Sequence, residues 1–179
     1  MATKFLEKNL EDIIFESDAD ELSERGLEIY GKLYRQFNLG KYGIADLVLY
    51  HKCEYDIEKR SSHRADCLVT VFELKRKLID INALMQAVRY VTGLIFYNKK
   101  HYKNYTFQYK IVLIGSEIDS KPEFLYFPEL IISNYQNTQL DIDKIVGIEF
   151  VKYSYGLDGI NFDYPYPYLY NELRQLNKK

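Results

Sequence analysis

Hydrophobic and polar residues recur with two different periods along this chain, and the longer period marks the helices. Apolar residues about one helical turn apart, on one face, predict helices over residues 3–16, 18–29, 83–98 and 168–176. Asp18 and Glu21 resemble a capping box at the start of the second of these helices. Asn82 is the predicted N-cap of the long third helix.

Runs of β-branched and other apolar residues mark the strands. The predicted strands cover residues 32–37, 44–51, 66–75, 106–115, 145–155 and 160–162. A polar loop should join the second and third of these strands into a hairpin, and Asp158-Gly159 predicts a tight turn between the last two. The order of elements predicts one α/β domain over residues 1–179, with a central mixed β-sheet flanked by helices.

Composition and cysteine content narrow the class of protein. The chain has 179 residues with 47% apolar and 28% charged, which suits one folded domain. No apolar run is long enough to span a bilayer, and the first residues lack the apolar core of a signal peptide. We therefore expect a cytoplasmic protein with no membrane partner. Cys53 and Cys67 either face each other across a hairpin or stay as reduced thiols, and reduced thiols suit a cytoplasm better.

Charge is distributed unevenly along the chain. The formal net charge is −2, which by itself argues against nucleic-acid binding. Residues 30–110, however, hold fifteen basic and seven acidic side chains, whereas the segments on either side are acidic. A positive field around an acidic centre suits a polyanionic substrate. Chance clustering of solvated lysines is the alternative.

Three charged residues interrupt the predicted hairpin strands. Asp46, Glu73 and Lys75 occupy positions in strands that otherwise read as buried, and burying a carboxylate is costly unless a partner compensates it. If the two strands pair as a hairpin, Asp46 lies nearly opposite Glu73, and Lys75 shares the face of Glu73. Two carboxylates at this spacing suit Mg²⁺, which takes oxygen ligands and keeps several waters. Each residue alone also has a structural explanation, because Glu-x-Lys pairs commonly form surface ion pairs.

The order and spacing of these residues resemble the PD-(D/E)xK nuclease superfamily. The resemblance rests on residues 42–46, 71–77 and 83–90, together with the opening helix from Leu6, and it covers roughly residues 5–115. The most similar pattern is the catalytic domain of NucS-type and RecB-like nucleases. The resemblance implies a restriction-endonuclease-like fold and a nuclease that depends on Mg²⁺ or Mn²⁺.

The same resemblance implies a role for each matching residue. Asp46 and Glu73 would bind the metal, Lys75 would be the catalytic lysine, and Gln86 and Tyr90 would form the helix motif of RecB-like nucleases. Glu7 would be the acid of the first helix by its spacing, although Glu11 or Glu16 could take that position. The cations expected to bind nucleic acid are Arg76, Lys77, Arg89, Lys99, Lys100 and Lys103.

The chain departs from the family pattern in three respects. Ala45 replaces the proline that names the superfamily, and residues 52–65 form a hairpin insertion. The separate N-terminal DNA-binding domain of NucS-type proteins is missing, so mismatch specificity is not expected. Residues 116–179 form a C-terminal extension outside the resemblance.

These observations predict a stand-alone metal-dependent nuclease acting on DNA in repair, restriction or mobile-element biology. The pattern leaves open whether the DNA is single-stranded, duplex or branched, and whether the protein is a homodimer. The alternatives are a catalytically silent module that binds nucleic acid or protein, and a plain α/β scaffold whose charged strand residues form surface pairs.

Overall fold

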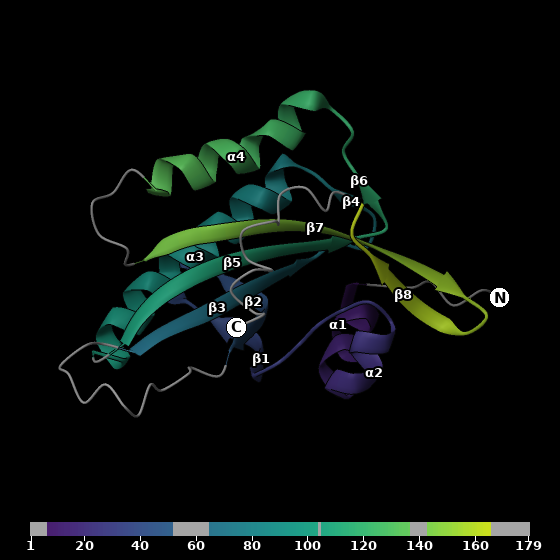
Figure 1. The fold of residues 1–179 in the computed structure, drawn as a ribbon, viewed down its shortest axis with the longest axis horizontal. Helices are drawn as coiled ribbons and strands as arrows, with labels where there is room; N and C mark the ends of the chain where they lie inside the picture. The colour runs from purple at the N-terminus through teal and green to yellow at the C-terminus, as the bar shows by residue number, and fades with distance from the viewer. Residues whose placement is uncertain (1–6, 52–64, 104, 137–142, 166–179) are drawn as a thin grey trace.

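The computed structural model describes residues 7–51, 65–103, 105–136 and 143–165 and consists of a mixed six-stranded sheet between helices (Figure 1). The strands, in their order across the sheet, are β1 (Lys32–Asn38), β2 (Ile44–Tyr50), β3 (Ala65–Leu74), β5 (Tyr105–Gly115), β7 (Lys144–Gly156) and β8 (Gly159–Asp163). The central strands β3, β5 and β7 are parallel, and the outer pairs are antiparallel. The predicted α/β class and the mixed sheet are therefore confirmed.

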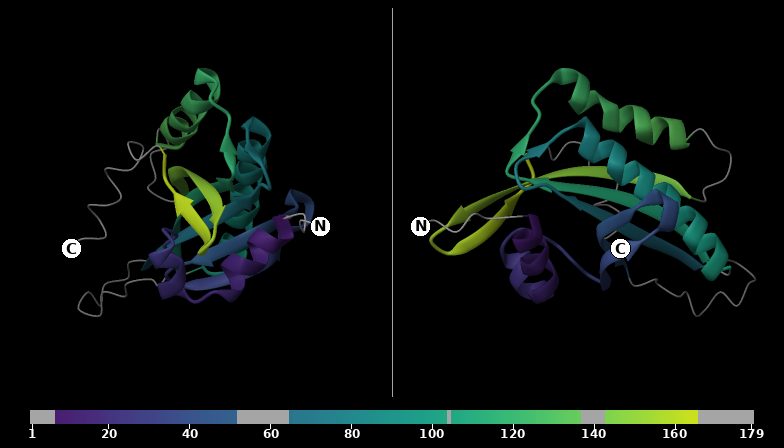
Figure 2. Two further views of the ribbon diagram at one scale, coloured as in Figure 1. Left: turned by 90° about the vertical axis from the view of Figure 1, so that its right-hand side faces the viewer. Right: turned by 180° about the vertical axis from the view of Figure 1, so that it is seen from behind.

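Helices cover both faces of this sheet (Figure 2). They are α1 (Glu7–Glu16), α2 (Ala19–Glu24), α3 (Ile81–His101), α4 (Pro122–Gln136) and the 3₁₀ helix η1 (Gly40–Tyr42). The α3 and α4 helices lie on one face, and α1 and α2 lie on the other. Each face has its own apolar core, because alternate residues of a strand point to opposite faces. A β3–α3–β5 crossover thus carries the chain over the first face.

The helix boundaries follow from local capping. The Asp18 side chain accepts hydrogen bonds from the backbone N–H groups of residues 20 and 21, so the predicted cap of α2 is confirmed. This helix ends at Glu24 rather than Ile29, because Gly26 adopts a left-handed φ of 92°. The predicted cap Asn82 is wrong. Asp80 takes that position, and its Oδ1 accepts from the N–H groups of residues 82 and 83 at 3.1 Å each.

The C-terminal extension adds elements that the sequence pattern did not predict. The α4 helix contains Pro128 in its interior, which breaks the usual helical signal. A second, two-stranded sheet joins β4 (Leu78–Ile79) to β6 (Glu117–Ile118). The β7–β8 hairpin is confirmed, with its turn at Leu157 and Asp158. The predicted helix over 168–176 and the insertion up to residue 64 lie outside the described residues.

Cys67 on β3 is disulfide-bonded in the structure. The chain has one other cysteine, Cys53, which lies outside the described residues. The expectation of a reduced thiol is therefore wrong for Cys67.

Among the described helices, not one combines the length and the apolar character needed to cross a bilayer.

Candidate active site at the end of the central strands

Asp46 lies at a position where strand pairing breaks on both sides of β2. On one side, β1 pairs Arg35 with Leu47 and Phe37 with Ala45 and omits the pair between them, where Gln36 has a φ of 49°. On the other side, the last residue pair with β3 joins Leu47, the residue that follows Asp46, to Phe72. The register therefore brings Asp46 and Glu73 together at the point where the ladder stops.

The half-buried carboxylate of Asp46 contacts the backbone of β3 at this break in strand pairing. Its Oδ2 accepts a hydrogen bond from the backbone N–H of Leu74 at 2.9 Å. Burial raises the pKa of the Asp46 carboxyl, while the Leu74 hydrogen bond and the charge of Lys75 oppose the rise. A carboxylate at the end of a ladder thus points toward β3 instead of forming a surface ion pair.

Glu73 is the most deeply buried carboxylate of this group, with 1% of its surface exposed. Its Oε1 accepts from Lys75 Nζ at 2.5 Å, as expected for residues two apart on one strand face. Its Oε2 is buried and has no hydrogen-bond partner among the described residues. Such an oxygen costs free energy unless a cation or a donor reaches it.

The charges around Glu73 shift its ionisation strongly. Burial raises the pKa of the Glu73 carboxyl to about 7, and the nearby Asp46 charge adds to the rise, while Lys75 opposes it. Burial acts to lower the pKa of Lys75, but the hydrogen bond and charge of Glu73, with smaller contributions from Glu7 and Asp46, raise it overall. Lys75 is therefore a protonated cation. The two carboxyls beside it share one positive neighbour, which leaves room for a second cation.

The first helix brings two further acids to the same end of the sheet. Glu7 Oε1 accepts from the backbone N–H of Arg76 at 3.1 Å, directly after Lys75. Glu11 is buried and accepts hydrogen bonds from the side chains of Arg35 and Gln36, the latter at 2.6 Å. Glu16 is exposed at the other end of the helix. Of the three acids considered for this helix, Glu7 is the one that contacts the strand segment carrying Lys75.

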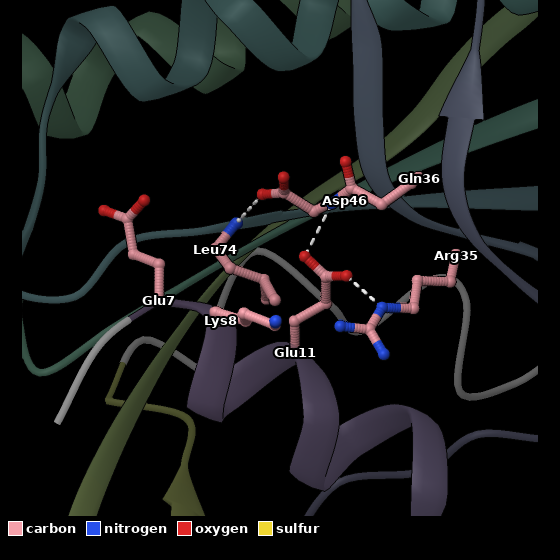
Figure 3. Close-up of a pocket in the computed structure, with 7 residues that line it drawn as sticks. All are labelled: Glu7, Lys8, Glu11, Arg35, Gln36, Asp46 and Leu74. Atoms are coloured by element: carbon pink, nitrogen blue, oxygen red, sulfur yellow. Dashed lines mark hydrogen bonds and ion pairs between the residues drawn. The ribbon is translucent and has the colours of Figure 1, made fainter.

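A pocket with a volume of about 410 Å³ lies between α1 and the strands β1, β2 and β3 (Figure 3). Its lining residues are Glu7, Lys8, Glu11, Arg35, Gln36, Asp46 and Leu74. In Figure 3, Asp46 and Glu11 lie close together at its centre, and Glu7 extends from the start of α1 beside them. Glu73 is not among the lining residues, and only 1% of its surface is exposed. The pocket therefore gives access to Asp46 but not directly to Glu73.

Gln86 and Tyr90 form a pair on α3, as the helical spacing predicts. Gln86 Nε2 donates to the Tyr90 hydroxyl at 2.6 Å, and Tyr90 is buried in the same core cluster as Val71 and Ala45. The Tyr90 ring packs on Gly43, where an added Cβ would come within 2.9 Å of Cε1. Because Gly43 precedes β2, this contact fixes the start of the strand that carries Asp46. No hydrogen bond links Gln86 to Asp46 or Glu73 in the described structure.

The predicted nucleic-acid-binding cations fall into two groups. Arg76, Lys77 and Arg89 are exposed near the carboxylate end of the sheet. The other three, Lys99, Lys100 and Lys103, follow or end α3, at the opposite end of β3 and β5. Gln86 and Lys99 are separated by about 20 Å along the helix. Lys99 is also paired with Asp143 at 2.6 Å, so this second group is remote from the carboxylates.

The side chains at this site would supply only some of the ligands that a metal ion needs. Within the described residues, no group of three or more histidine, cysteine, aspartate or glutamate side chains could hold a metal ion. Mg²⁺, however, is commonly bound by one or two carboxylates with waters and substrate phosphates. Asp46 and the unpartnered Oε2 of Glu73 fit that mode. These two carboxylates are the residues that would hold the ion.

Sequence reasoning missed the contacts that support Glu11. The ion pairs of Arg35 with Glu11 and Asp12, and the Gln36 hydrogen bond, connect α1 to β1. Their signal in the sequence is weak, because Arg35 and Gln36 are polar residues on a strand with no strict alternation. These contacts hold α1 against the sheet and thereby place Glu7 near Lys75.

Comparisons with protein-family models, with curated proteins and with solved structures found no match to this chain. Function is therefore inferred from the fold and from the geometry of the site.

Proposed function

We propose that this protein is a metal-dependent nuclease of the PD-(D/E)xK type, with a restriction-endonuclease-like fold, that hydrolyses phosphodiester bonds of DNA. The observation that supports this proposal most strongly is the environment of the Glu73 side chain. It is buried, ion-paired to Lys75, electrostatically coupled to Asp46, and left with one unpartnered oxygen. The mixed sheet with helices on both faces supports the same fold.

Each residue has a role that follows from its position. Asp46 and Glu73 would hold Mg²⁺ or Mn²⁺, which polarises a phosphate and lowers the pKa of bound water. Lys75, fixed by Glu73, presents a positive charge where negative charge develops on the phosphate oxygens. Gln86 and Tyr90 hold α3 against the strand that carries Asp46. Glu7 anchors the segment after Lys75 through the N–H of Arg76.

Cleavage of labelled DNA tests this function. Single-stranded, duplex and branched DNA are each incubated with the protein in Mg²⁺, Mn²⁺ or EDTA. We expect at least one substrate to be cut with metal and none to be cut in EDTA. Cleavage that persists in EDTA would overturn the metal-dependent mechanism. Failure of the folded protein to cut any of the three would overturn the nuclease and favour the silent binding module.

A further inference from the structure

The outer face of α3 carries an exposed stripe next to the candidate site. On a helix of 3.6 residues per turn, residues 85, 89, 92, 96 and 100 fall on one face. Met85 and Phe96 on this face are 54% and 59% exposed. Arg89 lies between them and is also exposed. This face therefore combines apolar area with a cation.

An aromatic pair forms the centre of the stripe. Tyr42 stacks on Phe96 with ring centroids 5.7 Å apart and planes inclined by 14°. Gly93 allows this approach, because a Cβ there would meet the Tyr42 Cβ at 2.8 Å. Lys41 Nζ lies 5.1 Å from the centroid of the Tyr42 ring. Since Tyr42 already covers one side of Phe96, the exposed part of the Phe96 ring is a flat, fixed surface.

The charge around this pair is of one sign. The α3 helix contains no acidic residue, and neither does the segment 29–45 that includes η1. Lys41 and Arg89 form no ion pair with a carboxylate in the described part of the chain. The nearest guanidinium nitrogen of Arg89 is 3.4 Å from the position of an added Cβ on Gly43, three residues before Asp46. Lys41 thus lies beside the aromatic pair, and Arg89 lies beside the start of the strand that carries Asp46.

We propose that Lys41, Tyr42, Arg89 and Phe96 form a track that binds single-stranded polynucleotide, with a base stacked on Phe96 and phosphates on Lys41 and Arg89. A base can stack on a side chain only when its face is free, whereas bases within a duplex are already stacked on each other. The exposed ring therefore favours an unpaired strand over a duplex. This track deepens the proposed nuclease function by naming its substrate as a single strand that enters beside Asp46.

Binding measured without turnover tests the track. Fluorescence anisotropy in EDTA compares a labelled single-stranded oligonucleotide with the matching duplex. We expect Phe96→Ala to weaken single-strand binding by about 5- to 150-fold, the range for loss of one base–aromatic stack, and to change duplex binding less than twofold. Arg89→Gln should also lower the slope of log affinity against log salt by about 0.7, the value for one phosphate contact on a single strand.

Tyr126→Ala is the matched control, because Tyr126 is 56% exposed on α4 and lies outside the track. Equal binding by wild type and Phe96→Ala, or equal losses in Phe96→Ala and Tyr126→Ala, would overturn the track. So would a wild-type protein that binds no single strand. Circular dichroism confirms that each variant is folded.

The two proposals can fail separately in these experiments. Single-strand binding that depends on Phe96, in a protein that never cuts DNA, would sustain the track and overturn the nuclease. Metal-dependent cleavage with single-strand binding indifferent to Phe96 would overturn the track and leave the nuclease.

Discussion

Replacing Lys75 with methionine is expected to slow metal-dependent DNA cleavage by about 10²- to 10³-fold, the range for loss of one group that stabilises charge in the transition state. Methionine keeps most of the length of the lysine side chain and removes the ammonium group, which lies 2.5 Å from Glu73 Oε1. Because Lys75 contacts Oε1 of Glu73 and leaves Oε2 for the metal, Mn²⁺ binding should persist in this variant. Rate constants from labelled DNA, measured beside Mn²⁺ affinity, separate the two effects.

Lys121→Met is the control for this variant. The Lys121 side chain is 75% exposed at the start of α4, and its ion pair is with Asp119 rather than with Asp46 or Glu73. Its cleavage rate should equal that of wild type. A Lys75→Met protein that cuts at the wild-type rate would remove this lysine from the chemistry. A variant that loses Mn²⁺ binding together with activity would instead show that Lys75 maintains the shape of the site.

The stability of the metal-free protein should depend on pH through Glu73. A carboxyl whose pKa is raised on folding, here to about 7, stabilises the fold fully below its unfolded pKa. That contribution is lost as the pH rises through about 7. Between pH 5.5 and pH 8, ionisation of Glu73 should therefore lower the free energy of unfolding by about 2 kcal/mol. Adding Mn²⁺ should restore stability most at the higher pH.

The pH dependence of wild-type stability does not report on Glu73 alone, because ionisation of His51 changes the free energy of unfolding in the opposite direction. Burial lowers the pKa of His51 to about 4, so this residue destabilises the fold as the pH falls through its unfolded pKa. Denaturant unfolding of wild type and Glu73→Gln at each pH removes the shared His51 contribution. The difference between the two proteins should change by about 2 kcal/mol over this pH range. A constant difference would show that Glu73 ionises normally.

Sequence pattern predicted the central strands well, because those segments carry strong and uninterrupted signals. Residues 106–115 are almost entirely apolar and form β5, which is buried between two parallel neighbours. The hairpin of β2 and β3 followed from two apolar runs around a polar loop. Its register brings Asp46 and Glu73 to the same end of the ladder, as the loop midpoint predicted.

Other features depend on contacts that a one-dimensional pattern does not contain. Asp80 and Asn82 are both good caps, and only the folded backbone shows that Asp80 accepts the two N–H groups. The α4 helix was missed because Pro128 interrupts its pattern. The buried, unpartnered oxygen of Glu73 results from packing between β3 and α3, so spacing alone could suggest the residue but not its environment.

The track on α3 was missed for a related reason. Phe96 reads in sequence as one more apolar residue of a helix, and Tyr42 as part of a glycine-rich turn. Their stacking arises only because Gly93 lets η1 approach the helix closely. The sequence placed substrate-binding cations at Arg76, Lys77 and Arg89 as well as at residues 99–103, and of these only Arg89 belongs to the proposed track.

The central claim is that Asp46 and Glu73 together hold a divalent cation, and calorimetric titration with Mn²⁺ tests it most directly. At pH 7 we expect one ion to bind and to release about half a proton, because Glu73 must ionise to become a ligand. Asp46→Asn and Glu73→Gln should each abolish this binding. The account would be contradicted if the wild-type protein bound no Mn²⁺, or if both variants bound Mn²⁺ as tightly as wild type does.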